Sequence, residues 1–385
     1  MVVLSQRLYD IITDSKLKWK TIQFIAPNEV PNPFITYEEN DTIEIGVTKK
    51  NYLKLFKEAH HYWHHKIIDV SNDYLNVIQT GSDEEIWNLY LCTIGYMITT
   101  NENHTIIRLH ELLVFEIYDD QGEEFIDKEL DLITAFLTSR LRRINKSSSL
   151  WFWIKKLTVL TLFNPLLNHQ KDVKSIGSML IDRAFRSSQL HFANYYASNY
   201  LRWFISVLGY IQYSEQSSLV KETAQQLLQH LQKGLQDLCR SNLRDVALWN
   251  LFEYYLITKY NPHHNVTFSL NEYNRIADQL SDYVEPLDIM ETDNISVDKE
   301  SNTKYIIDEI SWLLKVKCLI ETPYTTLLRP LIQLELHDEL RLVRDMIGTK
   351  CVEEQELLND FDDKDTELFK QKSEFVHTLS SVLIK

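Results

Sequence analysis

The chain carries an unusual run of basic residues between positions 132 and 171. This window holds no Asp or Glu, although the whole chain of 385 residues has a formal net charge of −15. Its basic side chains are Arg140, Arg142, Arg143, Lys146, Lys155, Lys156 and Lys171. Such a local inversion of charge attracts anions, which could belong to a phosphorylated ligand, a nucleic acid or an acidic partner. A solvated basic face without any ligand would show the same pattern.

Four histidines form a second group of residues that could do chemistry. His60, His61, His64 and His65 make two pairs at i, i+4 spacing, which can bind a divalent metal. The sequence makes no carboxylate or third well-placed ligand evident beside them, and it lacks an H-E-x-x-H motif. The pattern therefore favours a histidine cluster at a helix end against an interface, and we predict no metal site on this chain.

Other familiar catalytic and targeting patterns are missing from the sequence. It contains no G-x-S-x-G elbow, no Walker loop and no G-x-G-x-x-G, which argues against a hydrolase and a nucleotide-binding protein. Its cysteines stand alone without C-x-x-C spacing, which is typical of free thiols in a reducing compartment; they are Cys92, Cys239, Cys318 and Cys351. Without a signal-like start, a run of about 18 apolar residues or a C-terminal prenylation cysteine, the sequence predicts a soluble cytoplasmic protein.

Composition and periodicity predict an all-α chain. Glycine and proline occur only eight times each, too rarely for a hairpin-rich sheet protein. Residues 1–24 read as one helix, and residues 25–50 as an extended loop with a short strand pair. Helical periodicity dominates from residue 51 onward. The acidic stretches 286–304 and 353–367 read as surface loops.

These elements predict three parts. Residues 1–50 form an N-terminal helix and extended loop. Residues 51–340 form helical-hairpin repeats with an acidic loop insertion at 286–304. Residues 341–385 form a C-terminal acidic segment and a helix.

The basic window contains the start of a helix that recurs along the chain. Ser147, Ser148 or Ser149 can cap it, and apolar residues then follow at helical spacing from Leu150 and Trp151 onward. Similar openings place an anchor residue at 63, 107, 151, 198 and 249, in steps of 44, 44, 47 and 51 residues. The anchors are Trp63, Ile107, Trp151, Ser198 and Trp249. We interpret the tryptophans as packing residues and expect a sixth copy around 322–327.

A second amphipathic helix is predicted between successive anchors. The clearest examples are residues 130–144 and 219–238, each with apolar residues along one face. Each unit is therefore helix, turn, helix, and neither helix can bury its apolar face alone. Near-regular steps of this length are typical of a solenoid of stacked helical hairpins.

The ordered series of openings resembles the alpha subunits of protein prenyltransferases. That repeat places a polar turn, often N-Y-x-A, ahead of W-x-x-R on the second helix of each hairpin. The matching segments here are 62–66 (Y-W-H-H-K), 145–151 (N-K-S-S-S-L-W), 194–197 (N-Y-Y-A) and 244–249 (R-D-V-A-L-W). The arginine of the pattern survives only as Lys66, and Ile107 and Ser198 replace tryptophan. The chain is therefore most similar to the divergent alpha subunit of type III protein geranylgeranyltransferase.

The resemblance implies a fold and a role. It implies a right-handed superhelical crescent of hairpins that wraps a beta subunit of the Rab geranylgeranyltransferase type. That beta subunit would hold the zinc and the geranylgeranyl diphosphate, so no cofactor is expected on this chain. The protein substrate would be a SNARE, already farnesylated, that receives a geranylgeranyl chain on a cysteine.

The resemblance also assigns residues to the site. Lys146 takes the place of a lysine that contacts the diphosphate, where an ammonium stabilises the departing pyrophosphate. Ser148 stands where the family has a tyrosine. Arg142, Arg143, Asn194 and Tyr195 are expected nearby.

A non-catalytic helical-repeat scaffold is the alternative. Its basic window would bind an acidic peptide or RNA. The period is too long for a 34-residue repeat, and the net charge of −15 disfavours nucleic acid.

Overall fold

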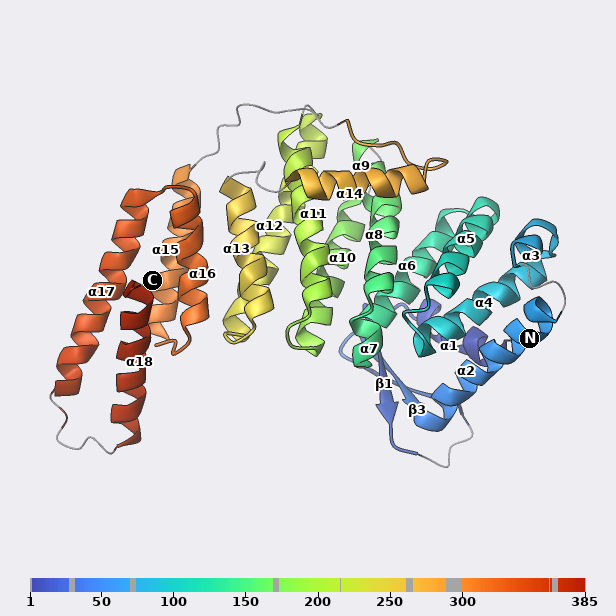
Figure 1. Ribbon diagram of the computed structural model, residues 1–385, viewed down its shortest axis with the longest axis horizontal. Helices are drawn as coiled ribbons and strands as arrows, with labels where there is room; N and C mark the ends of the chain where they lie inside the picture. The colour runs from blue at the N-terminus through green and yellow to red at the C-terminus, as the bar shows by residue number, and fades with distance from the viewer. Residues whose placement is uncertain are drawn as a thin grey trace. The chain divides into compact units, whose positions relative to one another are not determined.

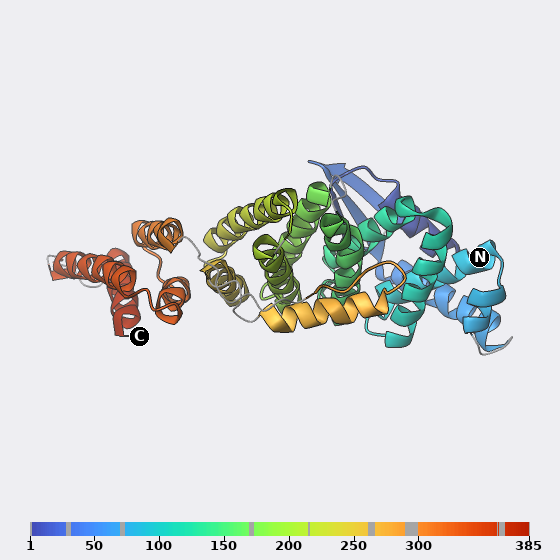
Figure 2. The ribbon, with the colours of Figure 1, turned by 90° about the horizontal axis from the view of Figure 1, so that it is seen from above.

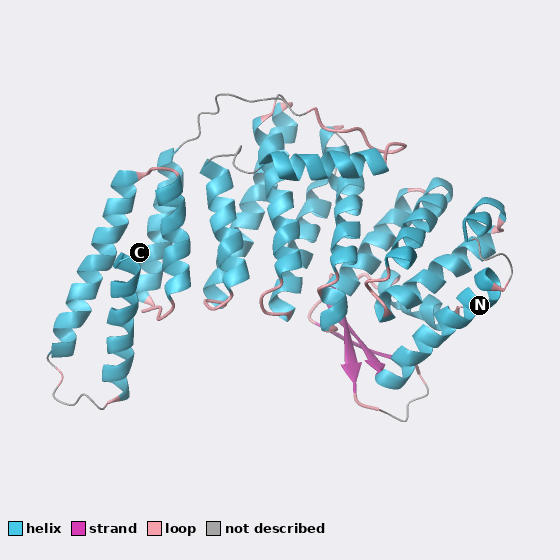
Figure 3. Ribbon diagram, viewed as in Figure 1, coloured by secondary structure: helices cyan, strands magenta, loops and turns pink. Residues whose placement is uncertain are grey.

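The computed structural model describes residues 2–27, 32–69, 74–168, 173–214, 216–260, 266–288, 299–359, 361 and 366–384. In these ranges the chain is mostly helical, as predicted, with one small sheet near the N-terminus (Figure 3). It divides into two compact units, Met1–Tyr200 with Ile276–Glu285, and Leu201–Arg275 with Pro286–Lys385. All four cysteines are free thiols. None of the described helices combines the length and apolar character needed to cross a bilayer.

The first unit begins with a helix and a three-stranded sheet. Helix α1 (Val3–Thr13) precedes β1 (Trp19–Ile25), β2 (Phe34–Glu39) and β3 (Thr42–Thr48). The strand order is β1-β3-β2, with β1 parallel and β2 antiparallel to β3. The turn between β2 and β3 places Asn40 and Asp41 at φ of 47° and 59°. Both residue types tolerate this left-handed region, which the tight turn requires.

One prediction for this region is wrong and one is confirmed. The predicted helix over residues 1–24 ends at Thr13, and residues 19–25 form β1 against β3. In the segment 25–50, the two alternating runs form the predicted strand pair, β2 and β3. Residues 28–31 lie outside the described ranges. A parallel partner more than twenty residues away stabilises β1, and local periodicity carries no signal of it.

The outer edge of β1 is covered by the turn that leads into the basic window. The Thr138 hydroxyl donates to Lys20 O, and the Ser139 hydroxyl and the Arg140 backbone N–H donate to Ile22 O. The buried Lys20 ammonium pairs with Asp131 of α6 (Glu123–Leu137) at 2.7 Å. Figure 2 shows the sheet at the edge of this unit, beside the helices that it contacts. These contacts fix the start of the basic window against the sheet.

Helices make up the rest of the first unit (Figure 1). They are α2 (Lys49–Trp63), the π-helical turn η1 (His64–Ile68), α3 (Tyr74–Thr80), α4 (Asp83–Thr99), α5 (His104–Gln121), α6, α7 (Arg142–Asn145), α8 (Ser148–Thr158), η2 (Val159–Phe163), α9 (Asn164–Leu167) and α10 (Val173–Leu190). Helices α4, α5, α6 and α8 pack on one another in chain order. Helices α11 (Tyr195–Tyr213) and α14 (Val266–Gln279) carry residues of both units.

The second unit is also helical. Its elements are α12 (Ser218–Ser241), α13 (Val246–Tyr260), α15 (Lys299–Lys315), α16 (Glu321–Gln333), α17 (His337–Asn359) and α18 (Glu367–Ile384). Helix α12 contains the predicted helix 219–238 and packs against α13. Helices α15, α16, α17 and α18 pack together.

Four helices open in the same register, which places four predicted anchors in equivalent positions. Ile107, Trp151, Ser198 and Trp249 are each the fourth residue of their helix, and all are buried. Each helix is preceded by a side-chain cap that accepts the backbone N–H of the third helical residue at 3.3 Å; the caps are Asn103, Ser147, Asn194 and Asp245. Such a cap contributes about 1 kcal/mol to helix stability. The recurring sequence pattern is therefore a recurring local structure.

The remaining predicted anchor, Trp63, does not begin a helix, so this prediction is wrong. It is the last residue of α2 and is half-buried. The cap of α2 is Thr48, which accepts the N–H of Asn51, so the fourth helical residue is Tyr52. The expected sixth copy matches in part: Tyr324 is the fourth residue of α16 and fully buried, but Ile320 provides no side-chain cap.

Three predicted element boundaries differ from those in the structure. The helix predicted over 130–144 ends at Leu137, and Leu141 begins a separate turn. Residues 299–304 of the first predicted acidic loop are helical, while 289–298 lie outside the described ranges. Residues 353–359 of the second belong to α17. Acidic composition does not exclude a helix, because an exposed helix face tolerates acidic side chains such as Glu353 and Glu356.

A buried polar network connects the helices under the basic window. Glu129 on α6 is fully buried and accepts three hydrogen bonds: from Tyr90 Oη at 2.7 Å, from His110 Nε2 at 2.9 Å and from Trp153 Nε1 at 2.9 Å. His110 Nδ1 lies 2.7 Å from the Thr93 hydroxyl. These residues come from α4, α5, α6 and α8, so one carboxylate joins two successive hairpins.

Candidate functional site

The turn between α7 and α8 has the geometry that its sequence predicts. Ser147 caps α8, and its hydroxyl donates to Asn101 O at 3.0 Å in the equivalent turn of the preceding hairpin. Trp151 is buried; its indole N–H donates to Asn145 O at 2.8 Å and its ring packs against Tyr200. These contacts fix the backbone of the turn, and with it the Cα positions from which the neighbouring basic side chains extend.

Lys146 is half-buried in this turn, and its ammonium is held by the next turn along the chain. Nζ donates to Phe192 O at 2.9 Å and to Ala193 O at 3.1 Å. Ala193 has a φ of 53°, in the left-handed region where a non-glycine residue is strained. Lys146 therefore stabilises a strained turn and also places a fixed positive charge at its side.

The two predicted residues that follow this turn have different roles. Asn194 is buried: it caps α11, and its amide donates to Asn145 Oδ1 at 2.7 Å and to Ser187 Oγ at 3.1 Å. It is a structural residue that ties the two turns together. Tyr195 is exposed and does not line either pocket described below, whereas its neighbour Tyr196 does.

The basic side chains of the turn line an open groove of about 970 Å³. Arg142, Arg143, Lys146 and Ser148 all border it, so four of the six predicted site residues meet there. Within the described part of the chain, the exposed guanidinium groups of Arg142 and Arg143 make no hydrogen bond or ion pair. The other lining residues are Thr99, Thr100, Asn101, Glu102, Asn103 and Tyr196.

Glu102 gives this groove one negative wall. It accepts hydrogen bonds from the hydroxyls of Ser148 at 2.8 Å and Ser149 at 3.1 Å. Partial burial tends to raise the pKa of Glu102, but hydrogen bonds from Ser147, Ser148 and Ser149 outweigh it and lower that pKa. Glu102 is therefore ionised at neutral pH, and Ser148 is engaged with a carboxylate.

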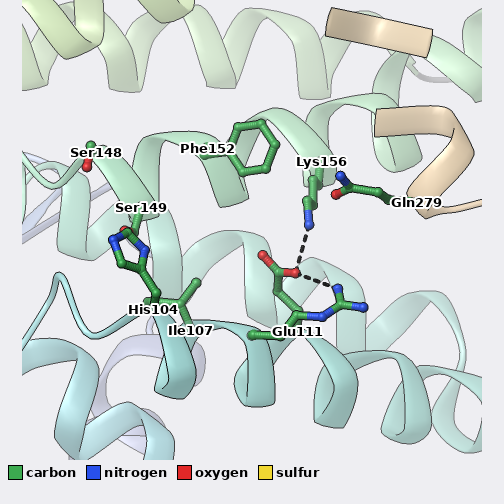
Figure 4. A pocket seen from close by; sticks show the side chains of 9 residues that line it. His104, Ile107, Glu111, Ser148, Ser149, Phe152, Lys156 and Gln279 are labelled. Atoms are coloured by element: carbon green, nitrogen blue, oxygen red, sulfur yellow. Dashed lines mark hydrogen bonds and ion pairs between the residues drawn. The ribbon is translucent and has the colours of Figure 1, made fainter. Parts of the chain in front are cut away.

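A second pocket of about 530 Å³ adjoins the groove and shares Ser148 with it. Its deep end is an ion triad in which one oxygen of Glu111 accepts from Lys156 Nζ at 2.7 Å and from Arg108 Nη1 at 3.1 Å (Figure 4). The side chains of Lys156 and Glu111 are 4% and 6% exposed. Phe152, Ser149, His104, Ile107 and Gln279 complete the lining.

Sequence reasoning missed the residues that the turn before α5 contributes to the groove, and most of those that α5 contributes to the second pocket. Glu102 stands five positions before Ile107, just as Lys146 stands five positions before Trp151. The spacing of the repeats therefore indicates that Glu102 and Lys146 occupy equivalent turns. Equivalent turns of these successive hairpins lie side by side, as the hydrogen bond from Ser147 to Asn101 demonstrates. Comparing charges at equivalent positions would have brought Glu102 next to the basic window.

The histidine cluster forms part of the α2–η1 junction. His64 Nδ1 and His65 Nδ1 lie 3.3 Å and 2.9 Å from the two carboxylate oxygens of Asp69. His60 Nδ1 lies 3.1 Å from the Tyr96 hydroxyl. Hydrogen bonds from His65 are the main cause of a lowered pKa at Asp69. Among the residues that the structure describes, no group of three or more His, Cys, Asp or Glu side chains could hold a metal ion.

The strain at Ala193 leads to a first prediction. Replacing Ala193 with glycine should raise the free energy of unfolding by about 0.5–1 kcal/mol, because glycine adopts positive φ without steric cost. Ala197→Gly in the first turn of α11 is the matched control and should instead lower it by about 1 kcal/mol. Urea denaturation of the full chain measures both; a destabilising Ala193→Gly would contradict the assignment.

These features define a helical protein with repeated, capped helix openings that carries a basic groove and an adjoining polar pocket. Residues 1–138 match the family model described as the ECM9 N-terminal domain, and residues 150–280 match that of the ECM9 middle domain. Protein ECM9 of Saccharomyces cerevisiae is 32% identical over 227 residues, which are 58% of this chain and 51% of that protein. The chain thus spans about half the length of this curated relative. No solved structure matches the chain.

Proposed function

We propose that this chain is the alpha subunit of a heterodimeric protein geranylgeranyltransferase, similar to the divergent type III alpha subunit. The observation that carries the proposal is the repeated opening of α5, α8, α11 and α13, each with a side-chain cap and a buried fourth residue. That register underlies the resemblance to prenyltransferase alpha repeats. The finer fold we propose is a right-handed superhelical crescent of these hairpins.

The basic groove supplies the chemistry that such a subunit needs. In the transfer, the sulfur of a substrate cysteine bonds to C1 of the geranylgeranyl group while the bond from C1 to the diphosphate oxygen breaks. The thiol gives up its proton, and pyrophosphate leaves with the electron pair. Preorganised cations lower the energy of that developing charge.

Three groove residues are assigned to this task. Lys146 offers an ammonium that the strained turn holds in place, and Arg142 and Arg143 offer exposed guanidinium groups suited to bidentate contact with phosphate oxygens. Ser148 bonds to Glu102 and is not assigned a phosphate contact. Asn194 acts through the turn that it holds, and Tyr195 stays outside the groove lining.

The proposed partners follow from the same assignment. A beta subunit of the Rab geranylgeranyltransferase type would hold the zinc and the geranylgeranyl diphosphate, and the substrate would be a farnesylated SNARE. The proposal also includes a cytoplasmic location for the protein.

Co-expression tests the proposal. The chain should co-purify with a Rab-type beta subunit at a 1:1 ratio, and the pair should transfer a labelled geranylgeranyl group to a farnesylated SNARE. The beta subunit alone and the chain alone are the controls and should be inactive. If the chain is monodisperse by itself and does not bind the beta subunit, the result would instead indicate a non-catalytic helical-repeat scaffold.

A further inference from the structure

The pocket between α5 and α8 presents three kinds of group along α8. Ser149, Phe152 and Lys156 line it from one face of the helix, at spacings of three and four residues. The distance from residue 149 to residue 156 is about 10 Å along the helix axis, at 1.5 Å per residue. Phe152 lies between the two polar ends (Figure 4). A ligand of this pocket therefore meets a polar end, an apolar stretch and a charged end.

The charged end has a net positive charge. Arg108 and Lys156 both pair with Glu111, so two cations face one carboxylate. Lys156 and Glu111 are almost completely buried, which fixes their geometry before a ligand arrives. One added monoanion neutralises this end. A dianion such as a phosphate monoester would leave an excess negative charge beside Glu111, where like charges repel.

Arg108 supplies the donors that a carboxylate needs. Its Nη1 donates to Glu111 at 3.1 Å, and within the described ranges of the chain its Nε and Nη2 groups make no hydrogen bond. The side chain is 58% exposed and lines the pocket. The N–H groups of Nε and Nη2 form the fork that binds both oxygens of a carboxylate. The charged end is therefore suited to one carboxylate.

The two serine hydroxyls at the polar end act as acceptors. Ser148 and Ser149 donate their hydroxyl protons to Glu102, at 2.8 Å and 3.1 Å. Glu102 itself lines the adjoining groove and is not part of the lining of this pocket. Because those protons are engaged, the hydroxyl oxygens offer lone pairs to the pocket. A ligand that pairs with them must bring a hydroxyl or an N–H group to this end.

The stretch between the two ends is apolar. Phe152 from α8 is half-buried, Ile107 from α5 is buried, and both line the pocket. The Lys156 ammonium lies 5.2 Å from the centroid of the Phe152 ring, so the charged end directly adjoins the aromatic wall. An aromatic ring packs on such a wall in an offset or edge-on arrangement.

We propose that this pocket binds a small aromatic monocarboxylate that carries a hydrogen-bond donor at the end opposite its carboxylate. The carboxylate binds the Nε–Nη2 edge of Arg108, the ring packs on Phe152, and the donor bonds to a serine hydroxyl oxygen. The cavity of about 530 Å³ lies within the range of small-molecule sites in proteins. This site goes beyond the proposed transferase function and does not depend on it.

Isothermal titration calorimetry with the purified full chain tests the proposal. The probe is 4-hydroxycinnamate, and its two controls are the carboxamide of the same compound and 4-methoxycinnamate, which lacks the donor. The probe should bind with a Kd below about 1 mM, and each control should bind about tenfold more weakly or worse. No binding of the probe at about 1 mM, or equal affinity for the probe and either control, would overturn the proposal.

A variant at the charged end makes the site assignment specific. Arg108→Gln should weaken binding of 4-hydroxycinnamate about tenfold or more and leave binding of the carboxamide unchanged, because only the carboxylate uses the fork. Arg341→Gln, at an exposed position on α17, is the matched control and should leave both affinities unchanged. Equal losses in the two variants would show that only net charge matters and would refute the site.

A second variant tests the apolar wall. Phe152→Leu should weaken binding of the probe and of the carboxamide by the same factor, since both carry the ring. Urea denaturation of each variant verifies that it is folded. Unchanged affinity in Phe152→Leu would contradict the assignment of this pocket. No beta subunit or isoprenoid is present, so a failed transfer assay leaves these results untouched.

Discussion

Replacing Glu129 with alanine is expected to lower the free energy of unfolding by about 3–5 kcal/mol, the usual cost of removing one partner from a buried charged network. The variant leaves Tyr90, His110 and Trp153 with polar hydrogens that face a cavity in place of a carboxylate. Urea denaturation followed by tryptophan fluorescence measures the change, because Trp153 itself contacts the carboxylate. The loss arises from desolvated donors and from the cavity together.

A matched control separates this effect from the loss of any glutamate. Glu116 lies on the exposed face of α5, and Glu116→Ala should change stability by no more than about 0.5 kcal/mol. A cost below 1 kcal/mol for Glu129→Ala would show that the network does not stabilise the stacked hairpins.

The same network sets a pH dependence with a definite sign. Burial tends to raise the pKa of Glu129, but the neighbouring His110 and the hydrogen bonds of His110, Trp153 and Tyr90 outweigh it and lower that pKa. A group with a lowered folded pKa contributes stability above its unfolded pKa of about 4.3, and that stability is lost as the pH falls through the folded pKa. The stability gap between wild type and Glu129→Gln should therefore be constant near neutral pH and shrink below about pH 4.

The features that could be predicted from the sequence are those encoded within a few residues. A cap and a buried fourth residue lie within one helical turn, which is why the openings at Ile107, Trp151, Ser198 and Trp249 were recognisable. The basic side chains of one turn, Arg142, Arg143 and Lys146, share the groove for the same reason.

The features that escaped prediction depend on partners far away in the chain. Strand β1 forms because β3 pairs with it. The residues around Trp63 match the sequence pattern of an anchor, although Trp63 is the last residue of its helix. The pocket needed α5 next to α8, about 45 residues apart. The buried pair at its deep end, Lys156 and Glu111, reads in the sequence as two ordinary surface charges, since burial is a property of the packed hairpins.

The proposed transferase function would give Lys146 a second role besides holding the turn, and on that proposal Lys146→Ala should lower kcat/KM for geranylgeranyl transfer by about 100-fold in the assembled enzyme. A preorganised donor at developing charge contributes roughly that much to a rate. The difficulty is that the same substitution removes two hydrogen bonds from the strained turn at Ala193. A loss of activity alone would therefore not distinguish a missing charge from a relaxed turn.

Ala193→Gly resolves this ambiguity because it relieves the strain without adding a charge. In the double variant Lys146→Ala, Ala193→Gly, the free energy of unfolding should recover toward wild type while transfer stays about 100-fold reduced. Lys155→Ala, a neighbouring lysine outside the lining of the groove, is the matched control for charge. If the double variant regained full transfer, Lys146 would act only by holding the turn, and the phosphate contacts would pass to Arg142 and Arg143, whose exposed guanidinium groups line the same groove.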